Sequence, residues 1–160
     1  MNIYTIGYEG LDMEGFLTLL RKSGVETLVD VRELPLSRKA GFSKRSLGDT
    51  LNLNGFEYIH LPTLGCPKPI REQYRVDGSW ARYKVGFLKY LEQQDDTIAE
   101  MAGMASTTTC ALLCFEADYN YCHRSMVANA IKNVSELQVV HLHAASLKKA
   151  ESESLNLEFA

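Results

Sequence analysis

The stretch CALLCFEADYNYCHRSMVANAI, residues 110–131, predicts the fold of the whole chain. Its apolar run at 111–115 has the length and content of a buried strand, and the apolar positions of 125–131 are spaced for a helix. A short polar segment joins the two. In an open α/β sheet, ligands bind at the carboxyl ends of the strands. The polar and sulfur-bearing side chains at this strand end are those of Cys114, Glu116, Asp118, Cys122, His123 and Arg124.

The rest of the chain repeats this alternation of strand and helix. Strands are expected at 2–6, 27–31, 58–61, 111–115 and 137–142, and helices at 12–23, 43–53, 80–94 and 125–131. Residues 98–104 extend the third helix or form a short one of their own. This order predicts an α/β fold, a single three-layer domain with a mostly parallel sheet of about five strands and helices on both faces. Because such crossovers are right-handed, the strands end at one edge of the sheet.

The length of 160 residues fits one domain, which we place at 1–143. From 144 to 160 the composition becomes polar, so we expect a poorly ordered tail or an exposed helical turn. Residues 63–78 contain closely spaced Pro and Gly, and we interpret them as a long irregular loop, either a functional lid or a disordered segment. No repeat or low-complexity stretch interrupts this organisation.

Composition limits where the protein is expected to work. The N-terminus shows no basic region followed by an apolar stretch and a small-residue cleavage site, and no run of about eighteen apolar residues occurs. We therefore expect a cytoplasmic protein that has no membrane partner. The four cysteines are too sparse for a disulfide framework, so we expect reduced thiols.

Charge is distributed unevenly along the chain. The formal net charge of -3 gives no overall attraction to nucleic acid or to an anionic membrane. Residues 32–45 nevertheless contain five basic side chains and a single acid, Glu33. The basic residues are Arg32, Arg38, Lys39, Lys44 and Arg45. A concentrated basic loop in an acidic protein favours a small phosphate-bearing ligand over general adhesion to polyanions.

The triplet Cys122-His123-Arg124 precedes the predicted helix at 125–131. Free backbone N–H groups and the helix dipole favour an anion at that position. Arg124 would add a bidentate pair of hydrogen bonds to a phosphate or carboxylate. The same field would lower the pKa of Cys122 and give a thiolate beside His123. The alternative is that Cys122 is a packed apolar residue and that Arg124 forms a surface ion pair.

The other strand ends carry further candidates. Cys114 ends an apolar strand, which by itself favours a core position. Glu116 leaves the strand above the sheet and needs a partner or water, so it is a general base, a ribose-hydroxyl acceptor or the partner of an arginine. Asp30 and Arg32 end another strand, where they bind an anion or form a structural pair. Tyr8 offers an aromatic face to a base or sugar, or belongs to an ordinary turn.

Zinc is a further option, because Cys114, Cys122 and His123 offer the thiol and imidazole ligands that it prefers. Adjacent Cys and His side chains rarely reach one ion, however, and the sequence has no CxxC pair. We therefore predict no metal ligands and keep a structural Cys/His metal site as an alternative.

Four segments resemble the DUF488 family, a domain of unknown function: TIGYEG at 5–10, LVDVRELPLSRKAGFSK at 28–44, YIHLPTLG at 58–65 and LLCFEADYNYCHRSMVANAI at 112–131. The chain differs from the family's pattern at Tyr8-Glu9 and at 117–120. The resemblance implies a small α/β domain. Its shared polar residues correspond here to Asp30, Arg32, Ser37, Arg38, Cys114, Glu116, Cys122, His123 and Arg124.

The preferred hypothesis is an enzyme, a hydrolase or transferase, that acts on a phosphate-bearing small molecule such as a nucleotide or a nucleic-acid end. The anion would be held by the helix N-terminus with Arg32, Arg38 and Arg124. Acid–base chemistry and a nucleophile would come from Glu116, His123 and Cys122 or Cys114. No motif identifies a cofactor. The alternative is a non-catalytic nucleic-acid-binding module in which the basic residues of 38–45 and 68–75 contact phosphates.

Overall fold

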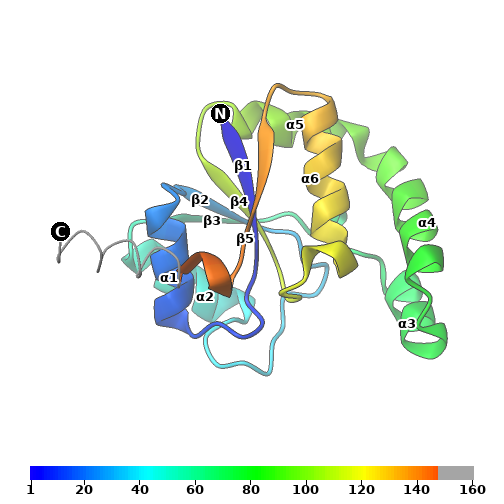
Figure 1. The fold of residues 1–160 in the computed structure, drawn as a ribbon, viewed down its shortest axis with the longest axis horizontal. Coiled ribbons are helices and arrows are strands. Elements are labelled where there is room, and N and C mark those ends of the chain that lie inside the picture. The colour runs from blue at the N-terminus through cyan, green and yellow to red at the C-terminus, as the bar shows by residue number, and fades with distance from the viewer. Residues whose placement is uncertain (148–160) are drawn as a thin grey trace.

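Five parallel strands form a single sheet in the order β3-β2-β4-β1-β5 in the computed structural model, which describes residues 1–147 (Figure 1). Each of the four neighbouring pairs runs parallel. The strands are β1 (Asn2–Gly7), β2 (Thr27–Asp30), β3 (Glu57–His60), β4 (Cys110–Cys114) and β5 (Gln138–Leu142). The parallel sheet predicted from the sequence is confirmed.

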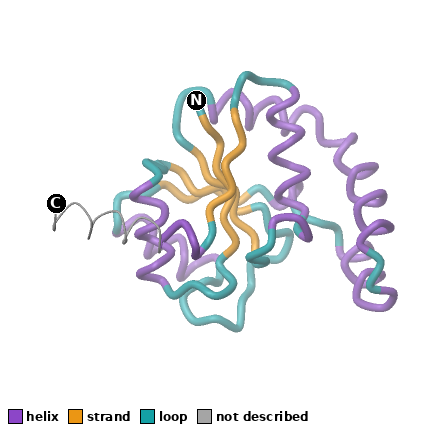
Figure 2. Tube along the Cα trace, viewed as in Figure 1, coloured by secondary structure: helices purple, strands orange, loops and turns teal. Residues whose placement is uncertain are grey.

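Helices cover both faces of this sheet, as Figure 2 shows. They are α1 (Met13–Lys22), α2 (Lys44–Leu53), α3 (Lys68–Asp77), α4 (Trp80–Leu91), α5 (Asp95–Ala105) and α6 (His123–Asn133). One buried cluster joins α1 and α2 to the sheet, and another joins α4, α5 and α6 to its opposite face. Helix α3 packs on the outside of α4. The result is the three-layer α/β architecture.

The side chains of β4 alternate between these two clusters, as the period of a strand requires. Ala111 and Leu113 face α1 and α2, whereas Cys110 and Leu112 face α4, α5 and α6. The whole strand is buried, as expected where helices cover both faces of a parallel sheet. Cys114 continues the second set, so its thiol lies on the side of the sheet where α6 begins.

The connections leave β2 and β4 toward opposite faces. The chain after β2 goes to α2, and the chain after β4 goes to α6, although the two strands are neighbours in the sheet. Such a divergence opens a crevice at the carboxyl ends of the two strands, which is the usual ligand site of open α/β sheets. The topology therefore places a crevice between the loops that follow Asp30 and Cys114.

The prediction of an irregular loop at 63–78 was wrong. Pro62–Leu64 forms a short 3₁₀ turn, and after residues 65–67 helix α3 extends from Lys68 to Asp77. Pro67 and Pro69 stand at the first turn of α3, where the missing N–H groups have no helical partner to lose. Ile70 and Tyr74, one turn apart, pack against the cluster under α4. The prolines therefore start a helix instead of preventing one.

Of three other predicted boundaries, the start of α6 differs from expectation, and the other two agree with one of the alternatives that the sequence left open. Residues 98–104 belong to a separate helix, α5, which a 3₁₀ turn at Glu92–Gln94 divides from α4. Helix α6 begins at His123, two residues before the predicted start. Residues 144–147 form a helical turn whose Leu147 packs near α1, and the remainder of the predicted tail, 148–160, lies outside the described residues. Within 1–147, no helix is long and apolar enough to cross a membrane.

Candidate functional site

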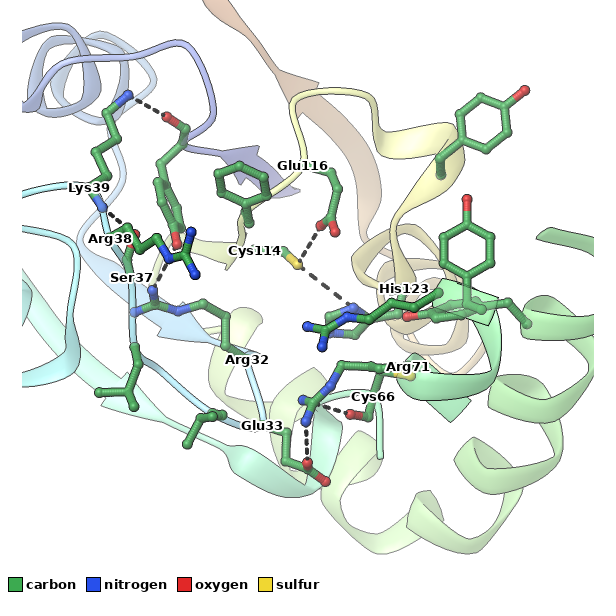
Figure 3. Close-up of a pocket in the computed structure, with 18 of the residues that line it drawn as sticks. Arg32, Glu33, Ser37, Arg38, Lys39, Cys66, Arg71, Cys114, Glu116 and His123 are labelled. Atoms are coloured by element: carbon green, nitrogen blue, oxygen red, sulfur yellow. Dashed lines mark hydrogen bonds and ion pairs between the residues drawn. The ribbon is translucent and has the colours of Figure 1, made fainter. Parts of the chain in front are cut away.

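A cavity of about 570 Å³ lies at the carboxyl ends of β2 and β4 (Figure 3). The loop after β2 forms one side, the start of the loop after β4 forms another, and α3 and α4 close the third. The predicted site residues that line it are Tyr8, Arg32, Ser37, Arg38, Cys114, Glu116 and His123. Those outside the lining are Asp30, Cys122 and Arg124.

A sulfur, a carboxylate and an imidazole meet at the buried end of this cavity. The Cys114 thiol donates to Glu116 Oε2 over 3.1 Å. Its Sγ also lies 3.7 Å from His123 Nδ1, and Cys122 Sγ lies 3.9 Å from the same nitrogen. Cys114 and His123 line the cavity, whereas Cys122 sits behind them with 2% of its surface exposed. Of the two thiols, Cys114 is therefore the one a ligand can reach.

Backbone groups orient the imidazole and the second sulfur. His123 Nε2 lies 2.7 Å from the carbonyl oxygen of Val31, so this nitrogen carries a hydrogen and Nδ1 faces the two sulfurs. The backbone N–H of Arg124 donates to Cys122 Sγ at the first turn of α6. The N-terminus of a helix favours negative charge, which stabilises the thiolate form of Cys122.

These contacts shift the pKa values of the four groups. Burial opposes the thiolate of Cys122, but hydrogen bonding to Cys114 and the adjacent His123 outweigh it and hold the pKa of Cys122 well below its ordinary value. Burial alone would lower the pKa of His123, yet the Cys122 thiolate raises it. The pKa of Cys114 is raised by the interaction with Cys122 and by burial. Burial and the charge of Cys122 raise the pKa of Glu116. The site thus favours a Cys122–His123 ion pair beside a Cys114 thiol that keeps its proton and a Glu116 carboxyl that holds its proton more tightly than an exposed one does.

Asp30 and Arg32 form a structural pair next to the cavity. Asp30 is fully buried, and its two oxygens accept Nε and Nη2 of Arg32 and the hydroxyl of Tyr58, the last over 2.5 Å. Burial would lower the pKa of Arg32, but the hydrogen bonds and charge of Asp30 raise it above its ordinary value. The carboxylate has no capacity left for a ligand, so Asp30 positions Arg32 and does not bind substrate directly.

The remaining donors of Arg32 hold the first turn of the chain. Its Nη1 donates to the Tyr8 hydroxyl over 3.2 Å and to the carbonyl of Phe42 over 2.7 Å. The Tyr8 ring stacks on Phe42 with centroids 4.6 Å apart. The Tyr8 backbone N–H donates to the carbonyl of Cys114, so it is not free for a ligand. Tyr8 therefore offers the cavity its ring and hydroxyl, and Arg32 keeps one of its five N–H groups.

Arg124 does not face the cavity, contrary to the expectation that it grips an anion. It is fully buried, and its Nε donates to Thr5 Oγ1 over 3.3 Å. Its Nη1 and Nη2 donate to the carbonyls of Glu116 and Ala117. Because these acceptors satisfy the guanidinium, Arg124 holds the loop after β4 in place and thereby positions the Glu116 side chain.

The basic loop after β2 brings cations to the opposite side of the cavity, as Figure 3 shows for Arg38 and Lys39. The Ser37 N–H donates to Ser43 Oγ, and the Ser37 hydroxyl accepts the Lys39 N–H, so the loop is closed by its own hydrogen bonds. Lys39 Nζ reaches the Tyr8 carbonyl at 3.4 Å. Arg38 is exposed. Ser37 therefore shapes the loop that presents Arg38 and Lys39.

Helices α3 and α4 contribute a third side, whose basic residues the sequence prediction named only in the nucleic-acid-binding alternative. Arg71 pairs with Glu33 over 3.1 Å, and Arg75 lies one turn further along α3. The aromatic residues of this side are Tyr74, Trp80, Tyr83 and, from the loop after β4, Tyr121. The signal was present: Arg71 and Arg75 are four residues apart, which puts them on one face of a helix.

Two glycines allow the loops around the site to approach each other. A Cβ on Gly7 would overlap the carbonyl of Glu116, where the end of β1 passes the loop after β4. A Cβ on Gly65 would overlap the backbone of Glu33, where the turn after β3 meets the loop after β2. Only glycine fits where two backbones lie this close.

Comparison with known proteins places this site in a family. Residues 12–131 match the family model described as "Domain of unknown function DUF488". The chain belongs to the DUF488 family. The DUF488 match spans β2, β3, β4 and every predicted site residue except Tyr8. No curated protein and no solved structure matches the chain. The DUF488 description names no activity, so the function has to be inferred from the site.

Proposed function

We propose that this chain is an enzyme, a hydrolase or transferase, that acts on a phosphate-bearing small molecule of the nucleotide type. The observation that carries the proposal is a single cavity with cations at its mouth and a Cys114–Glu116–His123 cluster at its buried end. Its volume of about 570 Å³ falls within the range of sites for small molecules. A cavity of this size holds one nucleotide more readily than a duplex.

The charge balance of the cavity supports an anionic ligand. Arg32 is neutralised by Asp30, and Arg71 is paired with Glu33. Of the cations that line the cavity, Arg38, Lys39 and Arg75 have no ion-pair partner among residues 1–147. They come from two sides of the cavity, so a phosphate between them would receive hydrogen bonds from both.

The aromatic wall supports a ligand that also has a flat ring. Trp80 stacks on Tyr83 with centroids 4.7 Å apart and meets Tyr121 edge-on. Trp80 is half-buried and Tyr121 is 55% exposed, so aromatic surface remains open to a ligand. Base–aromatic stacking contributes about 1–3 kcal/mol per base. A phosphate joined to an aromatic base would use both the cations and this wall.

The buried end of the cavity supplies the reacting groups. Burial raises the pKa of Glu116 from its ordinary value toward neutral pH, which suits the group to acid–base transfer. The Val31 carbonyl holds the ring of His123 so that its Nδ1 points at the two sulfurs, next to the thiol that a ligand can reach. Hydrolysis and group transfer both need a nucleophile and a proton donor next to the same scissile bond.

Thermal unfolding with a panel of ligands tests the proposal. Nucleoside mono- and diphosphates should raise the Tm of the wild-type protein more than nucleosides or inorganic phosphate do. Arg38→Ala and Arg75→Ala should reduce that shift, whereas Arg45→Ala, on the exposed side of α2, should not. Glu116→Gln should keep the shift and lose turnover of the bound nucleotide. A wild-type protein that no nucleotide stabilises would refute the proposal.

Salt dependence separates this function from nucleic-acid binding. A single phosphate pocket predicts a small change of Kd for a nucleotide between low and high salt. A module that contacts several phosphates of a strand predicts a steep loss of affinity. Tight, steeply salt-dependent binding of an oligonucleotide, together with no nucleotide binding, would favour the non-catalytic alternative.

A further inference from the structure

The two sulfurs and the imidazole at the buried end of the cavity surround one point. His123 Nδ1 lies 3.7 Å from Cys114 Sγ and 3.9 Å from Cys122 Sγ, and all three atoms lie within 4.8 Å of one another. Tetrahedral zinc with ordinary bond lengths separates a nitrogen and a sulfur ligand by about 3.6 Å. We propose that Cys114, Cys122 and His123 bind one zinc-type cation at this point.

The imidazole is held as metal-binding histidines usually are. Its Nε2 donates to the Val31 carbonyl over 2.7 Å, which directs the Nδ1 position at both sulfurs. A hydrogen bond from the second ring nitrogen to a carbonyl is the common way in which proteins fix the orientation of a histidine ligand. In the absence of a metal, a proton lies between His123 Nδ1 and the two cysteine sulfurs. A bound cation would replace that proton.

The sulfurs are held equally firmly. Cys114 is the last residue of β4, and Cys122 is the N-cap of α6 and accepts the backbone N–H of Arg124. The sequence argued against a metal because Cys122 and His123 are adjacent. Cys122 has extended backbone angles, φ -137° and ψ 140°, directly before the first helical residue. That change of backbone direction lets both neighbouring side chains reach the same point.

The ligand set indicates which cation and which kind of site. Two thiolates and an imidazole are soft ligands that suit zinc and disfavour magnesium or calcium. Structural zinc has four protein ligands, whereas three leave one position open, as in catalytic sites. Cys114 and His123 line the cavity, so the open position faces the anionic ligand. Glu116 Oε2, 3.1 Å from Cys114 Sγ, stands beside it.

Cobalt is the probe that tests this site. Chelator-treated, reduced full-length protein should bind one Co²⁺ per chain, with the visible bands of a tetrahedral ion and a sulfur-to-cobalt charge-transfer band that Zn²⁺ abolishes. Cys114→Ser, Cys122→Ser and His123→Gln should each weaken Co²⁺ binding by more than about tenfold. Cys110→Ala is the matched control, because this buried cysteine of β4 lies at the opposite end of the strand. It should bind Co²⁺ as the wild type does.

A second measurement does not depend on the folding of variants. Stoichiometric Zn²⁺ should protect Cys114 of the wild-type protein, the thiol that lines the cavity, from alkylation by iodoacetamide. A wild-type protein with no charge-transfer band, or equal losses in Cys110→Ala and Cys122→Ser, would overturn the metal site. The metal site is inferred from the arrangement of its three ligand atoms, which does not depend on the proposed nucleotide. The metal site and the proposed function can therefore be refuted independently. Nucleotide stabilisation without cobalt binding would leave the proposed function standing, and the reverse would leave the metal site.

Discussion

His123 of α6 donates its Nε2 hydrogen to the carbonyl oxygen of Val31, directly after β2, over 2.7 Å. The bond joins the two diverging loops of the crevice, because Val31 begins the basic loop and His123 begins the helix after β4. The Nε2–H group of His123 satisfies the buried Val31 carbonyl. It also leaves Nδ1 as the ring nitrogen that faces Cys114 and Cys122. One hydrogen bond therefore couples the architecture to the orientation of the candidate reacting groups.

Replacement of His123 should separate these two roles. His123→Ala leaves the Val31 carbonyl without its donor and removes the ring that packs edge-on against Phe87 at 5.3 Å. An unsatisfied buried polar group costs about 1–3 kcal/mol, to which lost packing adds. His123→Gln places an amide N–H near the former Nε2 and should recover part of that loss. Urea unfolding in the presence of a chelator measures both; equal losses in the two variants would contradict the role of this bond.

Arg124→Ala should destabilise the protein strongly. The substitution removes a fully buried guanidinium and leaves the carbonyls of Glu116 and Ala117 and the hydroxyl of Thr5 without their donor. At about 1–3 kcal/mol for each unsatisfied group, we expect a loss of about 3 kcal/mol or more in the free energy of unfolding.

The same substitution at Arg45, which is exposed on α2, is the control and should change stability by less than about 0.5 kcal/mol. Arg124→Lys should be intermediate, because it restores one donor group. Chemical denaturation with matched m-values gives the comparison. If Arg124→Ala proved as stable as Arg45→Ala, the assignment of Arg124 to the loop would be wrong.

Gly7→Ala should distort the site through the backbone. The added Cβ would overlap the Glu116 carbonyl, which also accepts from Arg124, so the loop after β4 must move. We expect a destabilisation of several kcal/mol, at the upper end of the range for point mutants, about 4 kcal/mol. Gly103→Ala in α5 meets no atom within 4 Å and should stabilise the helix by about 0.5–1 kcal/mol. In thermal unfolding, Gly7→Ala should lower Tm and Gly103→Ala should raise it. An unchanged Tm in Gly7→Ala would argue against the close approach of the loops.

The sequence predicted the features that depend on local periodicity. The apolar run before Phe115 and the helical spacing after Arg124 identified the central strand–loop–helix, and parallel topology brought Arg32 and Glu116 to one edge of the sheet. Composition also pointed to the basic loop with Arg38. These features follow from patterns of a few residues, which is why they could be read without coordinates.

The direction of individual side chains could not be predicted in this way. A cation at a helix N-terminus looks like an anion clamp in sequence, but Arg124 lies under the loop and bonds to its carbonyls. Asp30 is saturated by Arg32 and Tyr58, and Tyr58 comes from a strand that pairing alone brings alongside. Helix α3 was missed because Pro67 and Pro69 were taken as loop residues. The first two misses concern the direction of a side chain, which tertiary packing decides, and the third concerns a helix whose own prolines concealed it.

Cys110 should make the protein less stable in alkaline solution. Burial raises the pKa of its thiol to about 11, well above the ordinary value in an unfolded chain. Below the unfolded pKa both states keep the proton, so the thiol has no effect on the pH dependence. As the pH rises from about 9 toward 11, the unfolded state loses the proton first, and stability falls by up to about 1.4 kcal/mol per pH unit.

Cys110→Ala should remove this slope, although the cavity it creates lowers stability by a constant amount at every pH. Urea unfolding of both proteins at several values between pH 7 and 11 isolates the difference. Other buried groups such as Tyr58, whose pKa burial also raises, contribute equally to both proteins and cancel. Parallel stability curves for the two proteins would show that Cys110 ionises as readily in the folded state as in the unfolded one.

Trp80 should distinguish nucleotides from phosphate alone. Its ring forms the open part of the aromatic wall, whereas the unpaired cations Arg38 and Arg75 would bind any phosphate. Trp80→Leu removes the stacking surface and should weaken nucleotide binding by about 1–3 kcal/mol, which is about fivefold to 150-fold in Kd, with little change for inorganic phosphate. Trp80→Phe should retain most of the affinity, because a smaller aromatic face remains. Calorimetric titration of the three proteins with both ligands measures the difference. Equal losses for nucleotide and phosphate would mean that Trp80 shapes the cavity without contacting a base.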